Sequence, residues 1–348
     1  MDSFFIEFRD PLFGIIVFFV LVFVITFLSY WWGRYKYQES SKDLDNFLKG
    51  FNSLPSQDEL NIFIGNGELS KQSWLLLANT YFNNGDYEKS IDIYSELLKN
   101  SDLLASRNIM LLLGKTYFKA GFLERSKQIF LEILKNTPRT PEALQELLLV
   151  YENLRDYKSA LDVLESLEEL QEDIIKDSSY FQALAIIHDT KKPAEIKIEG
   201  LLKIYKQNHI LTYMIFEFLF RTDIKQAWKN FDITKSELLV DILWGIDKKD
   251  LDFDIISSSD FLTQLYSARG DLETAQESLV FEFDLLINLK SSVNVTLSFE
   301  YVCNSCQQNY PFAFNRCSHC HNIDTQNIEF SLTKDYYRDF GQENNSFQ

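Results

Sequence analysis

The sequence predicts an all-α repeat solenoid with one N-terminal transmembrane helix and a small four-cysteine β domain near the C-terminal end. Three observations predict this arrangement. An uncharged apolar stretch occupies residues 11–32, a helical pattern recurs about every 35 residues in the middle of the chain, and all cysteines lie between residues 303 and 320.

The composition is that of a globular protein with an acidic surface. Hydrophobic residues make up 46% of the chain and charged residues 24%, which is enough to build a folded core. The 34 basic and 51 acidic residues give a formal net charge of −17, which repels phosphate backbones unless basic residues concentrate locally. The sequence contains no basic run, so we expect no nucleic-acid partner.

Residues 11–32 have the length and composition of a membrane-spanning helix. The stretch contains no charged residue, and as a helix it would reach about 33 Å. Tyr30, Trp31 and Trp32 at its end are typical of the aromatic belt at a headgroup boundary. A cleaved signal peptide is disfavoured because its N-terminal flank would be basic, whereas this flank is mainly acidic. We therefore expect an uncleaved anchor.

Basic residues on the two sides of the anchor predict its orientation. Arg34, Lys36 and Lys42 follow the stretch, whereas Arg9 is the only basic residue before it. By the positive-inside rule, residues 1–10 lie outside the cytoplasm and the chain after the anchor lies within it. Because the cytosol is reducing, clustered cysteines are more typical of metal ligands than of disulfides.

The middle of the chain repeats the tetratricopeptide pattern of two helices per unit. The first clear copy is "WLLLANTYFNNGDYEKSIDIYSELLKN", which begins at Trp74. The second begins at Met110 with "MLLLGKTYFKAGFLERSKQIF", and the third at Leu144 with "LQELLLVYENLRDYKSALDVLESL". A further unit, "LTQLYSARGDLETAQESL", begins at Leu262, whereas residues 178–260 are helical in pattern but degenerate.

Small residues at Ala78, Gly114 and Ala160 let paired helices approach closely, and stacked pairs bury a continuous core behind a concave groove. Mixed polar and aromatic residues on the inner helices suit peptide capture, although a solvated face is an equal alternative for each of them. The candidate groove residues are Asn79, Phe82, Asn83, Lys115, Phe118, Lys119, Gln145, Glu152 and Asn153.

The four cysteines follow the spacing C-x₂-C-x₁₀-C-x₂-C. Cys303, Cys306, Cys317 and Cys320 form two knuckles, whose sulfurs complete the tetrahedral shell that Zn²⁺ and Fe²⁺/³⁺ accept. The flanking segments "VTLSFEYVC" and "NIEFSLT" alternate like strands, which predicts a rubredoxin-like or zinc-ribbon domain over residues 298–334. We expect one metal ion in a closed, structural site.

This ribbon, residues 298–334, is too small to form a hydrophobic core of its own. We expect it to dock against the last helices of the solenoid, because its aromatic residues need cover. These are Tyr301, Tyr310, Phe312 and Phe314. His319 and His321 stand beside the ligands and are interpreted as surface histidines, since four cysteines already close the shell.

The domain boundaries follow from these segments. After the anchor, residues 33–57 form a juxtamembrane segment or a degenerate first repeat, and residues 58–297 form the solenoid. Residues 335–348 follow the ribbon as a C-terminal tail. No catalytic motif or phosphate-binding glycine loop appears, so we expect a protein without enzymatic activity.

Together, the anchor, the solenoid and the ribbon resemble the lipopolysaccharide assembly protein B family of Gram-negative bacteria. The resemblance is most specific in "YWWGRYK", in "RNIMLLLGKTYFKAGFLERSKQIF", in "ALQELLLVYENLRDYKSALDV" and in the ten-residue spacing between the knuckles. The chain departs from the family at Gln307, where members often carry glycine, and it lacks a proline after Cys317.

The resemblance implies an inner-membrane adaptor with a periplasmic N-terminus. Members of the family bring the lipid A-pathway deacetylase, UDP-3-O-acyl-N-acetylglucosamine deacetylase, to the membrane protease FtsH, and they coordinate lipopolysaccharide synthesis with inner-membrane assembly, transport and sensor proteins. Two alternatives stay open: a membrane-tethered scaffold for another complex, and an electron carrier with a rubredoxin-type iron site. The oligomeric state is also open, with a homodimer among the alternatives.

Overall fold

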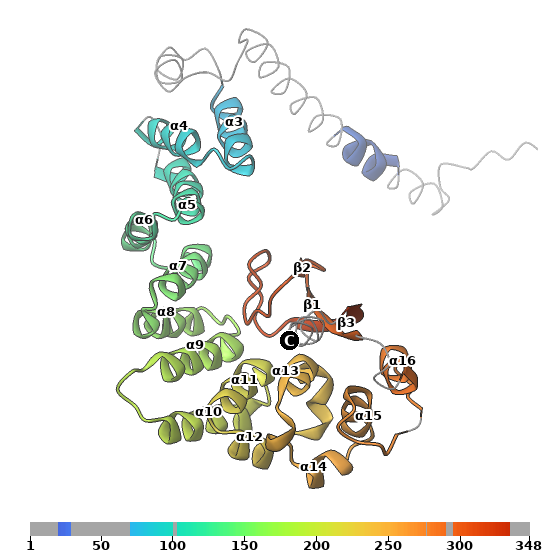
Figure 1. The fold of residues 1–348 in the computed structure, drawn as a ribbon. Helices are drawn as coiled ribbons and strands as arrows, with labels where there is room; N and C mark the ends of the chain where they lie inside the picture. The colour runs from blue at the N-terminus through green and yellow to red at the C-terminus, as the bar shows by residue number, and fades with distance from the viewer. Residues whose placement is uncertain (1–19, 29–69, 100–102, 276, 290–294, 335–348) are drawn as a thin grey trace, which may run out of the picture. The chain divides into compact units, whose positions relative to one another are not determined.

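The computed structural model describes residues 20–28, 70–99, 103–275, 277–289 and 295–334 (Figure 1). Helices are followed by a small antiparallel sheet, as the sequence predicts. The chain divides into two compact units, one ending at Asp156 and the other beginning at Tyr157. Each unit is described by itself.

Helices of the first unit pack on their neighbours in chain order, α3 on α4, α4 on α5, α5 on α6 and α6 on α7. This is the contact pattern of helical repeats, in which each element covers the apolar face of the next. The helices are α3 (Lys71–Asn83), α4 (Tyr87–Lys99), α5 (Leu103–Lys119), α6 (Leu123–Asn136) and α7 (Pro141–Leu154).

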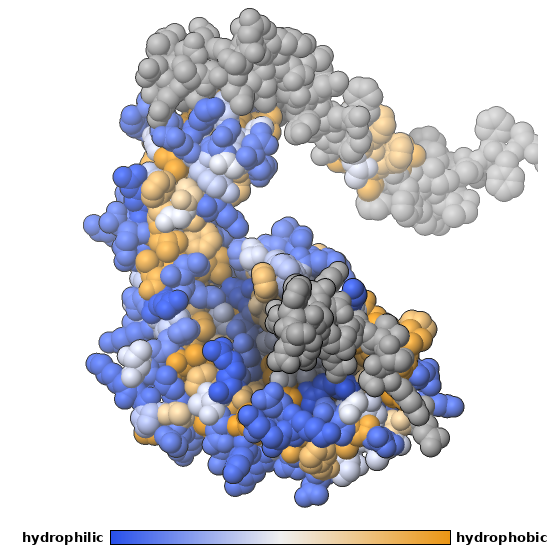
Figure 2. Space-filling view, in the orientation of Figure 1, coloured by the Kyte–Doolittle hydropathy of each residue, from blue (hydrophilic) through white to orange (hydrophobic). Residues whose placement is uncertain are grey.

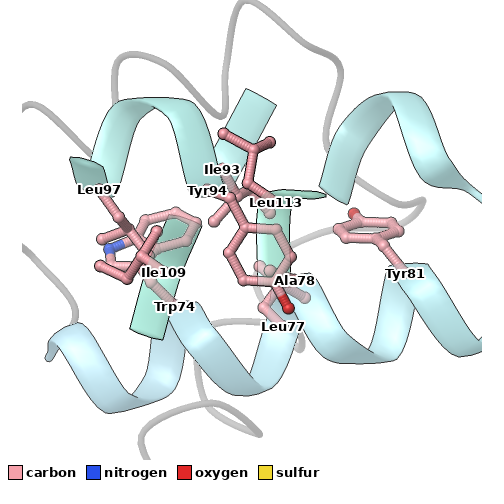
Figure 3. Close-up of a cluster of buried hydrophobic side chains, with 9 residues drawn as sticks. All are labelled: Trp74, Leu77, Ala78, Tyr81, Ile93, Tyr94, Leu97, Ile109 and Leu113. Carbon is pink, nitrogen blue, oxygen red and sulfur yellow. The ribbon is translucent and has the colours of Figure 1, made fainter. Parts of the chain in front are cut away.

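The core of this unit begins with a cluster of buried side chains from α3, α4 and α5 (Figure 3). The contributing positions of α3 are spaced three and four residues apart, which places them on one face of the helix. The cluster consists of Trp74, Leu77, Ala78, Tyr81, Ile93, Tyr94, Leu97, Ile109 and Leu113. Five of these residues, Trp74, Leu77, Ala78, Tyr81 and Tyr94, are positions that identify the first repeat in the sequence.

Gly114 shows why the next repeat requires a small residue. A Cβ at this position would lie 2.6 Å from the buried ring of Phe130, so any side chain would force α5 and α6 apart. The close approach also lets the Ser126 hydroxyl donate a 2.8 Å hydrogen bond to the Gly114 carbonyl oxygen. The glycine thus joins the two helices of the repeat.

Helices of the second unit are shorter and less regular than those of the first. The degenerate stretch 178–260 is helical, as predicted, but two of its elements are 3₁₀ helices. The helices are α8 (Tyr157–Glu169), α9 (Ile175–His188), α10 (Ala194–Asn208), α11 (Thr212–Thr222), α12 (Ile224–Asn230), η1 (Ile233–Leu239), α13 (Val240–Gly245), η2 (Lys248–Asp250), α14 (Phe253–Ser257), α15 (Asp260–Arg269) and α16 (Phe281–Leu289).

The repeat predicted from Leu262 is only half regular. Its first helix is α15, but the second helix predicted around Ala275 is not formed there, and the next helix begins at Phe281. In this stretch, side chains accept hydrogen bonds from backbone N–H groups that a helix would use. The Ala275 N–H donates to the Ser267 hydroxyl, and the Ser278 N–H donates to the Asp284 carboxylate. Because of these local hydrogen bonds, the helix begins later in the chain, at Phe281.

The C-terminal strands form a three-stranded sheet in the order β2-β1-β3, with both pairings antiparallel. Tyr301 pairs with Tyr310, and Cys303 pairs with Gln326. The two predicted strands are confirmed: β1 has the bounds of the segment "VTLSFEYVC", and β3 extends the segment "NIEFSLT" by one residue at each end. The strands are β1 (Val295–Cys303), β2 (Asn309–Tyr310) and β3 (Gln326–Lys334).

Within the described residues, no helix has both the length and the apolar character needed to cross a membrane. Residues 20–28 are helical, and their apolar side chains are exposed and appear orange in Figure 2. The rest of the predicted anchor 11–32, together with residues 1–10, 33–69 and 335–348, lies outside the described residues. The anchor therefore stays a prediction.

Candidate metal centre

Two chain turns bring the four cysteines together. Cys303 ends β1 and Cys306 lies in the turn toward β2, whereas Cys317 and Cys320 lie in the loop before β3. All four sulfur atoms lie within 4.8 Å of one another. The Sγ atoms of Cys303 and Cys320 are 3.7 Å apart, and those of Cys306 and Cys317 are 3.6 Å apart.

These separations fit a single metal ion. A tetrahedron with metal–sulfur bonds of about 2.3 Å has sulfur–sulfur edges of about 3.8 Å. A disulfide would need a separation near 2.05 Å, and all four cysteines are free. The four thiols could therefore hold one metal ion, and cysteines at every corner would leave no position open for substrate.

The two knuckles share one backbone design. The Gln307 N–H donates to the Cys303 carbonyl oxygen at 2.8 Å, and the His321 N–H donates to the Cys317 carbonyl oxygen at 2.9 Å. Gln307 and His321 have φ angles of 58° and 61°, a left-handed conformation that favours glycine. The departure from the family pattern at Gln307 thus keeps the turn but places a side chain in a strained conformation.

Hydrogen bonds at the sulfurs favour thiolates, the form that binds metal. The Thr325 hydroxyl lies 3.2 Å from Cys303 Sγ, and the Tyr310 hydroxyl lies 3.1 Å from Cys317 Sγ. Burial alone would raise the pKa of the Cys303 and Cys317 thiols, but these hydroxyls and nearby backbone N–H groups outweigh it and lower both. Burial raises the pKa of Cys306, so one thiol of the first knuckle ionises before the other.

Arg316 fastens the second knuckle to helix α9. Its Nη2 lies 3.2 Å from Asp177 Oδ1, and its guanidinium lies over the rings of Tyr180 and Phe181 at 5.0 and 5.6 Å. A guanidinium can pair with a carboxylate and stack on aromatic faces at the same time, which suits it to a partly buried interface.

The first strand is held by a half-buried carboxylate of α13. Asp241 Oδ2 accepts hydrogen bonds of 2.7 Å from the hydroxyls of both Tyr301 and Tyr213. Burial, followed by the contact with Asp241, raises the pKa of each tyrosine. On the edge strand β3, Phe330 stacks on Phe283 of α16 with centroids 5.3 Å apart.

A fourth contact links the loop beside the candidate metal site to α11. The Leu211 N–H, at the start of that helix, donates a 3.0 Å hydrogen bond to Asp324 Oδ2. Asp324 precedes Thr325, whose hydroxyl contacts a candidate metal ligand. The ribbon therefore docks on α9, α11 and α13 as well as on α16, a wider surface than the predicted last helices.

The predicted cover by the helices is shown for one of the four ribbon aromatics, Tyr301, whereas Tyr310 and Phe314 pack within the ribbon. Tyr301 is bonded to the solenoid, and Tyr310 packs on Phe314 with centroids 4.7 Å apart. Phe312 is 79% exposed, so its predicted burial is wrong. His319 is exposed, and His321 contributes its backbone carbonyl to a 2.8 Å hydrogen bond from Arg316.

The candidate groove residues lie on α3, α5 and α7, the first helices of the predicted pairs. Phe82 packs edge-on against Tyr87 of α4, and Lys115 Nζ forms a 2.9 Å ion pair with Glu146 Oε1 of α7. Asn153 donates to the Leu149 carbonyl of its own helix. The exposed members of the set are Asn79, Asn83, Lys119, Gln145 and Asn153, and the half-buried members are Phe82, Lys115, Phe118 and Glu152. Partner binding by this set stays a prediction.

Sequence reasoning missed the residues that join ribbon and helices. Asp177 and Arg316 are 139 positions apart, and Tyr301 and Asp241 are 60 apart, so no local pattern connects them. One signal was present: charged residues in a stretch whose repeat pattern has degenerated suggest contacts outside the repeat.

Comparisons with known proteins agree with the repeat pattern. The tetratricopeptide repeat family matches residues 71–101 and residues 111–173. A search of curated proteins found no match. Among solved structures, a fragment of MamA from Desulfovibrio magneticus RS-1 (residue 41 to its end) is 20% identical, with a TM-score of 0.35 over 46% of this chain and 90% of that one. A MamA RS-1 double mutant is 18% identical, with a TM-score of 0.35 over 51% and 93%. Residues 71–101 and 111–173 of this chain are therefore tetratricopeptide repeats.

Proposed function

We propose that the protein is a membrane-anchored adaptor that regulates lipopolysaccharide biosynthesis and has no catalytic activity of its own. Tetratricopeptide repeats indicate a protein–protein interaction scaffold. The finer assignment rests on the resemblance to the lipopolysaccharide assembly protein B family, which spans the anchor, the repeats and the cysteine spacing.

The adaptor lowers the level of the lipid A-pathway deacetylase by holding it near FtsH. An adaptor of this kind needs no chemistry, because confining substrate and protease to one membrane patch raises their effective concentration. The groove residues on α3, α5 and α7 are the proposed contact surface for a partner peptide. The anchor at residues 11–32 places this surface on the cytoplasmic side of the inner membrane, with residues 1–10 in the periplasm.

The four cysteines hold one Zn²⁺ or Fe²⁺/³⁺ ion in a structural role. The mutual distances of the sulfurs support this, since they match the edges of one tetrahedral shell. Metal binding supplies folding free energy to a segment too small to own a core. The electron-carrier alternative instead requires iron and a reversible one-electron wave in voltammetry.

The test is the half-life of the deacetylase in depleted cells that express variants of this protein. Replacing Phe82, Lys115 and Phe118 together by alanine should lengthen the half-life, since a few anchors dominate such interfaces. Replacing Glu132 and Lys135, exposed residues of α6 outside the groove, should leave it unchanged. If depletion itself does not change the half-life, the scaffold serves another complex.

A further inference from the structure

The second unit contains a groove lined by residues of α10 and α12, two helices that are labelled in Figure 1. This α10–α12 groove has a volume of about 730 Å³, which is within the range of pockets that hold ligands. Its apolar lining comes from Ile198, which is 6% exposed, and from the half-buried Leu202. The groove is separate from the candidate surface on α3, α5 and α7.

Lysines surround the apolar lining. Lys203 and Lys206 of α10 and Lys229 of α12 all line the same pocket, and all three are exposed. They are separated along the chain, so the sequence shows no basic run where the fold gathers three lysines. Within the part of the chain that the structure describes, no ion pair or side-chain hydrogen bond engages these three amines.

The surrounding segment reverses the charge of the chain. Residues 190–230 contain eight basic and four acidic residues, whereas the whole chain contains 34 basic and 51 acidic residues. A segment with excess positive charge on an acidic protein attracts an acidic partner and orients it during encounter.

The acidic residues of the groove limit what can bind. Glu195, Glu199 and Asp223 also line it, so a uniformly charged polyanion such as nucleic acid would meet repulsion along part of its length. A flat layer of lipid headgroups would contact the lysines but could not fill the pocket. A peptide can place carboxylates near the lysines and apolar side chains on the lining.

We propose that the α10–α12 groove binds a peptide segment of a partner protein in which acidic side chains adjoin apolar ones. The stretch of α10 from Glu195 to Gln207 is about 18 Å long, which matches a helical segment of about twelve residues. Carboxylates of the segment pair with Lys203, Lys206 and Lys229, and its apolar side chains pack on Ile198 and Leu202.

The experiment measures fluorescence anisotropy of labelled peptides with the full-length protein. The main probe is a peptide of about twelve residues in which glutamates flank a leucine-rich centre. One control probe carries lysines in place of the glutamates, and another carries serines in place of the leucines. We expect the main probe to bind at least about tenfold more tightly than either control.

Variants of the protein locate the site. Lys203→Glu with Lys206→Glu should weaken binding of the main probe about tenfold or more. Lys191→Glu with Lys225→Glu changes the net charge equally at exposed positions that do not line the groove, and it should leave binding within about twofold. Leu202→Ser should also weaken binding.

Three outcomes overturn the proposal. Equal loss of affinity in the two double variants would show attraction by net charge alone. Equal binding of the serine-substituted probe would exclude the apolar lining from recognition. Binding of phosphatidylglycerol vesicles that depends on Lys203 and Lys206, without peptide binding, would identify the surface as a membrane contact.

Discussion

The repeats of the first unit and the helices beneath the ribbon are held by different kinds of contact. In the first unit, α3, α4 and α5 share a buried apolar cluster (Figure 3), and α5 and α6 meet at a glycine. In the second unit, the ribbon is joined to the helices through charged and hydrogen-bonding groups, namely Arg316 with Asp177, Tyr301 with Asp241, and Leu211 with Asp324.

The difference explains where the repeat pattern degenerates. A repeat that touches only its neighbours can keep one pattern of small and aromatic residues. Helices that also receive a second domain must present groups suited to it: α9 and α13 present the carboxylates of Asp177 and Asp241, and the start of α11 presents the backbone N–H of Leu211. The loss of the repeat pattern between residues 178 and 260 therefore reflects the contacts of these helices with the ribbon.

Removing candidate metal ligands is expected to produce the largest difference in stability between the ribbon region and the repeats of the first unit. Cys303→Ser together with Cys317→Ser takes one ligand from each knuckle, so metal content should fall from about one equivalent to nearly none. Structural sites of this type supply on the order of 10 kcal/mol of folding free energy. Hydrogen exchange should accelerate across β1, β2 and β3 and in α9, while α3 to α5 keep their protection.

The matched control is His319→Ala, which lies between two ligand cysteines in an exposed position and should retain the metal. Elemental analysis and hydrogen-exchange mass spectrometry provide the two readouts. Equal acceleration in α3 to α5 would show that the regions do not differ in their dependence on the metal.

Arg316→Ala should have the next largest effect. The Arg316 side chain is 12% exposed and that of Asp177 is 32% exposed, so the ion pair is partly screened by solvent. Loss of the pair and of two ring contacts should cost about 2–3 kcal/mol of unfolding free energy, less than a fully buried pair.

Arg221→Ala serves as the control for this prediction. Arg221 is 80% exposed and pairs with Glu217 at 3.9 Å, so its removal should cost less than about 0.5 kcal/mol. Urea denaturation measures both values. Similar losses in the two variants would mean that Arg316 acts as an ordinary surface charge.

A pair of glycine substitutions compares packing in the two regions. Gly114→Ala brings a methyl group to 2.6 Å from the buried Phe130 ring, which should cost about 1–3 kcal/mol, partly offset by about 1 kcal/mol of helix propensity. Gly200→Ala meets the end of the Ile186 side chain at 3.0 Å, which can move. The first variant should be destabilised by up to about 2 kcal/mol, and the second should be near neutral. Thermal unfolding that lowers both equally would contradict the comparison.

The features that could be predicted from the sequence are those with local causes. The repeats could be recognised because each copy has characteristic residues at fixed positions, such as Trp74 at the first position, Gly114 at the fifth and Tyr151 at the eighth of their copies. The knuckles could be recognised because two residues separate the cysteines of each pair. The ribbon interface could not be predicted, because Asp177 and Arg316 meet only after the chain has folded. The late start of α16 was missed for a related reason: helix propensity does not reveal that Ser278 will bond to Asp284.

The smallest predicted effect concerns the tyrosine pair on Asp241. Both hydroxyls donate to the same carboxylate oxygen, so Tyr301→Phe leaves one donor in place and should cost about 1 kcal/mol near pH 8. Tyr301→Phe combined with Tyr213→Phe leaves a half-buried carboxylate without either donor. The double variant should therefore lose more than the sum of the single losses.

The pH dependence of Tyr301→Phe tests the same contact. In the folded protein, burial and then Asp241 raise the pKa of Tyr301 above its usual 10.0, so folding keeps the phenol protonated. Its contribution to stability is complete below about pH 10 and is lost as the pH rises further, because the unfolded chain then releases the proton more readily. Phenylalanine cannot ionise, so the difference in unfolding free energy between the original protein and the variant should shrink above pH 10. Urea denaturation at pH 8 and pH 11 measures this difference, and an unchanged gap would show that the tyrosine is not held by the carboxylate.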